Sequence, residues 1–264
     1  MLPARTCRAL RTSLALAAAL AVSAPADEPA WRTQDVEGWT VHVRQELLRD
    51  QRDATEHAVD VIRAHLANIV KVVPAPAVAE LRKVALWVSP EYPGVKPRAE
   101  YHPGEDWLRE QGRDVAMVKG VEFTNVRIID RETKRMPVFV LHELAHAYHD
   151  RVLGFGHAEV NAAYDHAMAA GLYDAVERSH VEDGKPNTVE RAYAATNERE
   201  YFAEMTETFF GRNDFFPFTR DDLARHDPEM FRTLTKAWGA PEDCVRDAPP
   251  NFKEHSGAGH KPDK

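Results

Sequence analysis

Cysteine is nearly absent from this chain of 264 residues, in which only Cys7 and Cys244 occur. Cys7 falls in a segment that we expect to be removed during export, so the mature protein would keep Cys244 alone. A single cysteine excludes an intramolecular disulfide. The mature protein must therefore be stabilised by its packed core rather than by covalent cross-links.

The chain also lacks an excess of basic residues. It contains 34 lysines and arginines against 42 aspartates and glutamates, which gives a formal net charge of −8. Removal of the three arginines in the first 26 residues would change that charge to −11. Nucleic-acid binding is therefore not expected, because it requires a basic surface.

The first 26 residues have the composition of a secretory signal peptide. Three arginines precede an apolar stretch at 14–22, and Ala24-Pro25-Ala26 follows as a cleavage signal. The apolar stretch is too short for a stable membrane span, and Cys7 lies upstream of it, where a lipoprotein cysteine would not be. We expect export to a periplasm or to the extracellular medium, a single domain over residues 27–240 and a disordered tail over 241–264.

Hydrophobic periodicity predicts a mixture of helices and short strands. Strands are expected at 39–44, 84–88, 121–129 and, as a pair, between 173 and 193. Helices are expected at 55–73, 105–111, 137–153, 158–172, 198–210 and 228–239. This pattern predicts an α+β domain with a small sheet and a C-terminal helical lobe. A proline-rich loop over 89–104 contains His102, and a lone histidine in such a loop is more often solvated than part of a site.

Residues 142–146 read HELAH, an HExxH motif. Two imidazoles four residues apart project from one face of a helix, so His142 and His146 can hold one metal ion. Glu143 lies about 100° further round the helix, where a general base can reach a metal-bound water. The chain has 13 histidines, so the motif could also arise by chance, with both rings simply hydrogen-bonded on a packed helix.

The surroundings of the motif favour the metal site. Pro137 suits the first turn of a helix, and Gly154 suits its end. Apolar residues recur at steps of three and four along one side, so that side should pack into a core while the histidines face a cleft. These apolar residues are Leu141, Leu144, Ala145, Tyr148 and Val152.

The expected strand at 121–129 comes just before this helix, which resembles the zincin arrangement. There, an edge strand beside the cleft pairs with an extended peptide substrate. An ordinary strand inside a sheet fits the sequence equally well.

A third metal ligand must come from elsewhere, because a catalytic zinc takes three protein ligands and keeps one position for water. The metzincin pattern needs glycine and histidine at positions where this chain has His149 and Val152, so it does not apply. Glu200, Glu204 and Glu207 share one face of the helix at 198–210 and would attract a cation. A solvated acidic face is the alternative, and physical reasoning alone does not separate Glu200 from Glu204.

The span from Val140 to Phe210 resembles the catalytic domain of anthrax lethal factor and its relatives, which are gluzincin-type metallopeptidases. The resemblance rests on HExxH, a tyrosine and the helix motif NEREYFAE at 197–204. It implies that Glu200 completes a zinc site with His142 and His146, that Glu143 is the general base, and that Tyr193 assists catalysis.

Two further roles follow for residues of this span. The neutral phenol of Tyr193 could donate a hydrogen bond to the oxyanion that develops as water attacks, although a buried structural tyrosine is the alternative. We expect Glu204 to orient a ligand histidine through its free ring nitrogen.

The sequence therefore predicts an exported zinc metallopeptidase, with endopeptidase action on protein or peptide substrates. A zinc amidase acting on cell-wall peptides remains open, because the same water chemistry serves any amide bond. A non-catalytic, zinc-stabilised binding protein is a third possibility. Such a protein would have no need of Glu143 and Tyr193.

Overall fold

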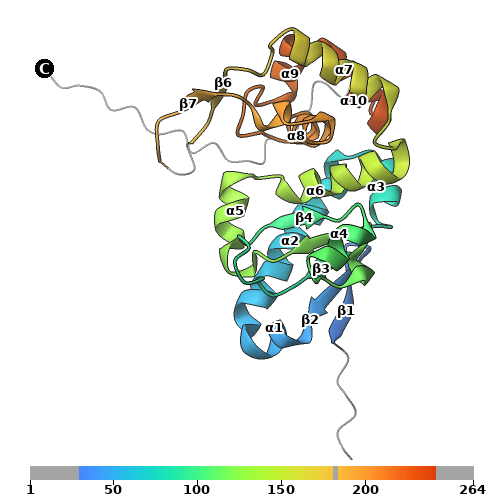
Figure 1. The fold of residues 1–264 in the computed structure, drawn as a ribbon, viewed down its shortest axis with the longest axis vertical. Coiled ribbons are helices and arrows are strands. Elements are labelled where there is room, and N and C mark those ends of the chain that lie inside the picture. The colour runs from blue at the N-terminus through green and yellow to red at the C-terminus, as the bar shows by residue number, and fades with distance from the viewer. Residues whose placement is uncertain (1–29, 181–183, 242–264) are drawn as a thin grey trace, which may run out of the picture.

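The computed structural model describes residues 30–180 and 184–241. The expected leader at 1–26 and nearly all of the expected tail at 241–264 lie outside this part of the chain. A sheet with its covering helices forms the lower half of the molecule, and helices with a hairpin form the upper half (Figure 1). Among the described residues, no helix has both the length and the hydrophobicity needed to cross a membrane.

The main sheet has five strands in the order β1-β2-β3-β5-β4. Its inner pairs β2–β3 and β3–β5 are parallel, while β1–β2 and β4–β5 are antiparallel, so β1 and β4 form the two edges. A separate hairpin pairs β6 with β7. The strands are β1 (Trp31–Val36), β2 (Trp39–Arg44), β3 (Leu86–Val88), β4 (Ala99–Tyr101), β5 (Val121–Phe123), β6 (Val176–Arg178) and β7 (Thr188–Glu190).

The helices follow the predicted order, with additions. The additions are α1, α3, α5, α9 and short helical turns. The α-helices are α1 (Gln45–Asp50), α2 (Arg52–Val72), α3 (Ala75–Leu81), α4 (Glu105–Glu110), α5 (Ile129–Arg135), α6 (Phe139–Tyr148), α7 (Ala158–Ala169), α8 (Glu198–Phe210), α9 (Arg220–His226) and α10 (Pro228–Trp238). The 3-10 helices are Val115–Met117, Val126–Ile128 and Tyr193–Ala195, and a π-helical turn spans His149–Leu153. The structure is thus a mixed α+β fold with a small sheet, as predicted.

The expected strand at 121–129 is shorter than predicted and is not an edge strand. β5 ends at Phe123 and lies between β3 and β4. Val126 and Ile129 are buried, but they belong to a 3-10 turn and to α5. A short apolar run cannot by its period distinguish a strand from a helical turn, and here the turn packs against α2. The edge strand that lies against α6 is β4, which falls inside the segment predicted to be a loop.

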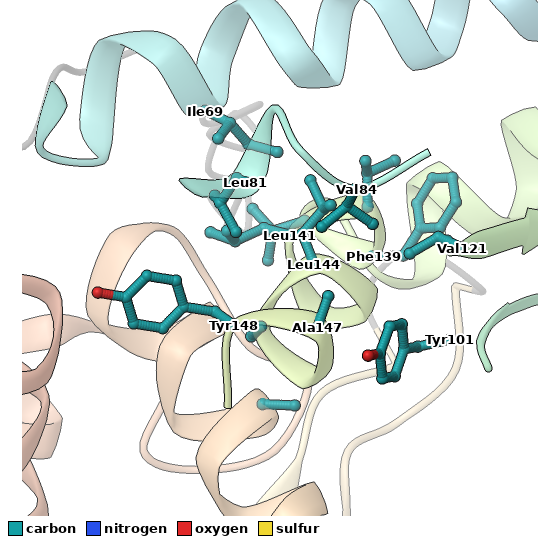
Figure 2. Packing of buried hydrophobic residues seen from close by; sticks show 14 of the residues in the cluster. Ile69, Leu81, Val84, Tyr101, Val121, Phe139, Leu141, Leu144, Ala147 and Tyr148 are labelled. Atoms are coloured by element: carbon teal, nitrogen blue, oxygen red, sulfur yellow. The ribbon is translucent and has the colours of Figure 1, made fainter. Parts of the chain in front are cut away.

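The helix that carries the HELAH motif packs its apolar side into the core. Leu141, Leu144 and Tyr148 are buried as predicted, and they lie with Leu81 beneath α2 (Figure 2). Val152, predicted to share this side, is 42% exposed. It lies in the π-helical turn after α6, where the wider helical turn changes the direction of the side chains.

Helix α8 begins where the sequence predicts. The Asn197 side chain caps it by accepting hydrogen bonds from the backbone N–H groups of Arg199 and Glu200. At its other end Gly211 allows close approach to the start of α6, because a Cβ there would lie 2.6 Å from a Val138 methyl carbon. Contact between α6 and α8 therefore brings the glutamate face against the histidine face.

Candidate metal centre

His142, His146 and Glu200 meet at the interface of α6 and α8. The Nε2 atoms of the two histidines are 3.1 Å apart, and Glu200 Oε2 lies 3.3 Å from each of them. Ligand atoms of these three residues form one of the two groups in the described part of the chain that lie close enough together to hold a metal ion. The structure thus brings together the three residues that the resemblance designates as ligands.

This triangle has the dimensions of a metal site. A tetrahedral zinc ion with bonds of about 2.0–2.1 Å would separate its ligand atoms by about 3.3 Å. Glu200 Oε2 is buried and has no hydrogen-bond partner among the described residues. Two imidazole nitrogens and a carboxylate oxygen are also a donor set that zinc prefers. The residues present therefore fit a zinc ion.

The charges around the triangle favour a cation as well. Burial opposes ionisation of Glu200, but the neighbouring imidazoles of His142 and His146 hold its pKa well below the usual range. Burial would likewise lower the pKa of His142, yet Glu200 and Glu207 raise it well above its ordinary value. Without a metal, the protonated imidazole of His142 supplies the positive charge next to these carboxylates. A metal ion that binds Nε2 must displace the proton there.

Glu143 lies between α6 and the edge strand. Its Oε2 atom accepts a hydrogen bond of 2.9 Å from the backbone N–H of Tyr101 on β4. The sequence does not predict this contact, because β4 lies in the segment predicted to be a loop. This hydrogen bond fixes one carboxylate oxygen of the proposed base against β4, close to the two histidines of α6.

A second contact ties β4 to the end of the metal helix. The Tyr101 hydroxyl donates to Asp150 over 2.8 Å, and Lys119 Nζ approaches the same carboxylate to 2.5 Å. Strand β4 therefore runs along α6 in a fixed position. It takes the edge position beside α6 that the zincin interpretation gave to residues 121–129, and β5 is instead the ordinary inner strand that was the alternative.

Tyr193 lies in the 3-10 helix directly before α8 and is 49% exposed. This exposure excludes the alternative of a buried structural tyrosine. Partial burial and then the negative charge of Glu200 raise the pKa of its phenol, so the hydroxyl keeps its proton at neutral pH. A half-exposed, neutral donor near Glu200 is compatible with the role implied by the resemblance.

The contact expected of Glu204 is made instead by Glu207. His142 Nδ1 lies 2.6 Å from Glu207 Oε1, whereas Glu204 Oε1 is 3.5 Å away. Glu204 Oε2 accepts from Asn213 Nδ2 over 3.0 Å. Both carboxylates are buried, which excludes a solvated acidic face. The i, i+4, i+7 spacing of the three glutamates was the available signal for Glu207.

His102 is neither solvated nor part of this centre. It is 1% exposed, and its Nε2 lies 3.0 Å from Glu122 Oε2. Side chains alternate along β4, so His102 and Tyr101 lie on opposite faces of the sheet. Tyr101 faces α6, and His102 packs against Trp107 of α4.

Comparison with known families agrees with this geometry. The family model of the glucose-regulated metallopeptidase M90 matches residues 123–238, which include all of α6 and α8. The match covers less than half of the chain and supports a metallopeptidase with a metal cofactor. It does not confirm the resemblance to anthrax lethal factor. No curated protein and no solved structure matches the chain.

Proposed function

We propose that this protein is an exported, zinc-dependent peptidase of zincin-like fold, with zinc held by His142, His146 and Glu200. The proposal rests on one observation above all. Three ligand atoms form a triangle with sides of 3.1–3.3 Å, and the carboxylate of Glu143 lies on the next residue of the same helix.

Bound zinc would polarise the carbonyl of the scissile bond and lower the pKa of an attacking water. Glu143 accepts a proton from that water and delivers it to the leaving amine. Its Oε2 atom is fixed by the Tyr101 amide, so proton transfer falls to Oε1. Tyr193 donates a hydrogen bond to the oxyanion that forms on the carbonyl oxygen.

The position of β4 suggests how a peptide would bind. Arg98 and His102 use their backbone groups to pair with the strand next to them. Alternation in an antiparallel ladder directs the backbone of Ala99 and Tyr101 to the opposite edge of β4, where the Tyr101 N–H already donates to Glu143. An extended peptide can pair with the Ala99 backbone at that edge and pass the metal centre, which favours a peptide substrate and endopeptidase action.

Cleavage of cellular proteins by the parent and by Glu143→Gln protein tests the proposal. The variant should keep its zinc and its fold but lose roughly 10²-fold or more in turnover, because an amide cannot accept the proton. A variant that cleaves as fast as the parent would remove Glu143 from the mechanism. Parent protein that binds zinc without hydrolysing any peptide would instead support the non-catalytic alternative. Hydrolysis confined to cell-wall peptides would support the amidase.

A further inference from the structure

We propose that Glu207 is the positioning residue of the metal centre, and that Glu204 is not. This inference rests on the proposed function, because it assigns a role in presenting His142 to zinc. The helix motif ends at Glu204, and the resemblance gives no role to Glu207.

The helix geometry of α8 explains why Glu207 reaches the site. Residues seven apart are separated by nearly two full turns and differ by only about 20° in direction around the axis. Residues four apart differ by about 40°. Glu200 and Glu207 therefore point more nearly the same way, and they meet His142 at opposite ring nitrogens.

A metal ligand histidine must be neutral, with its proton on the nitrogen that does not face the metal. Which nitrogen keeps the proton is decided by the hydrogen bond that it makes. Glu207 Oε1 accepts from Nδ1 over 2.6 Å, so the lone pair of Nε2 is left facing Glu200 and His146. Glu207 thereby fixes both the tautomer and the orientation of the ring.

Glu204 is held by a different partner. Asn213 Nδ2 donates to its Oε2 and also to its backbone oxygen, each over 3.0 Å. Its Oε1 lies 3.5 Å from His142 Nδ1, which is beyond the range of a well-formed hydrogen bond. Glu204 therefore connects α8 to the loop that follows it, rather than orienting the ligand.

Zinc affinity measured by competition with a chelator tests the assignment. We expect Glu207→Ala to weaken zinc binding about 10- to 100-fold, which is the usual effect of losing such a contact. Glu207→Gln should recover part of that loss, because its amide oxygen still accepts from Nδ1. The matched variant Glu204→Gln should bind zinc as the parent does. In the cobalt-substituted proteins, the visible absorption bands should shift for the Glu207 variants alone.

Each outcome has one meaning. Weaker binding by Glu204→Gln, with parent-like binding by Glu207→Gln, would overturn the assignment. If Glu207→Ala does not fold, the absorption of cobalt-substituted Glu207→Gln decides, and bands identical to those of the parent overturn the assignment. Failure of the parent itself to bind zinc would contradict the proposed function rather than the choice between the two glutamates.

Discussion

Two groups of buried carboxylates differ in charge balance: one surrounds Glu122 on β5, and the other lies around His142, between α6 and α8. On the α4 side, Glu122 receives hydrogen bonds from Tyr92, His102 and Arg113 over 2.7–3.0 Å. Burial alone would raise the pKa of Glu122, but the hydrogen bonds from His102 and the other donors outweigh burial. The pKa of Glu122 is therefore lowered, and the carboxylate stays ionised. On the α6 side, burial raises the pKa of both Glu204 and Glu207.

The comparison shows how a structural group differs from a metal site built of the same residue types. A buried charge must be compensated, and Arg113 compensates Glu122 within the protein itself. Around His142 lie three carboxylates, namely Glu200, Glu204 and Glu207. His142 and His146 together cannot balance them without extra protons. The first group is complete as it folds, whereas the second would be completed by the divalent cation that we propose.

The largest effect should come from removing Glu200, the carboxylate of the group around His142 that faces both histidine Nε2 atoms. Glu200→Ala should lose its zinc completely during dialysis against a mild chelator, because two histidines alone are a weak chelate. Glu204→Gln and Glu122→Gln are the controls, and both should keep the metal. Metal analysis after dialysis gives the answer. Loss of zinc from Glu204→Gln but not from Glu200→Ala would place the third ligand one helical turn further along α8.

Stability should instead depend on the group around Glu122. Glu122→Gln should lower the free energy of unfolding by about 3 to 5 kcal/mol, because it leaves the Arg113 charge buried without its main partner. Denaturant unfolding of the metal-free protein measures this loss. Glu100→Gln should cost less, since Glu100 is more exposed and is the second partner of Arg113. Equal stability of the parent and Glu122→Gln would show that the group is not structural.

Local signals explain what the sequence could predict. Helix α8 was placed correctly because Asn197 caps it, and α10 because Asp227-Pro228 and Gly239 mark its two ends. The spacing within HELAH fixes which residues share a helix face. Each of these signals lies within a few residues of the feature that it determines.

The features that were missed depend on contacts between distant residues. Strand β4 has three residues in a proline-rich segment, and it forms a strand only because it pairs with β5. The edge position follows from the order of strands, which no local pattern encodes. The choice of Glu207 over Glu204 depends on a side-chain distance across two helices that differs by less than 1 Å.

A smaller effect is expected at Tyr193, which lies near Glu200 of the group around His142. Tyr193→Phe should lower kcat/KM, with a loss of transition-state stabilisation of about 2 to 4 kcal/mol. Zinc content and stability should not change, because the phenol is half exposed. Tyr92→Phe removes a hydroxyl from the group around Glu122. This variant should lower the free energy of unfolding by about 1 kcal/mol and leave turnover unchanged. Steady-state kinetics and denaturant unfolding of both variants separate the two cases. A loss of stability alone in Tyr193→Phe would contradict its catalytic role.

A pH-dependent effect is expected at His149, a buried ionisable residue outside both groups. Its ring packs on Phe155 and Phe202, and neither ring nitrogen has a hydrogen-bond partner among the described residues. Burial lowers its pKa from 6.5 to about 4, so folding favours the neutral ring. Its contribution to stability is therefore full above pH 6.5 and is lost as the pH falls towards 4. Between pH 8 and pH 5 this loss is about 2 kcal/mol. Denaturant unfolding of the metal-free parent and of metal-free His149→Leu at both pH values measures this loss. On acidification, the free energy of unfolding of His149→Leu should fall by about 2 kcal/mol less than that of the parent. An equal fall in both proteins would show that His149 is not the group that titrates.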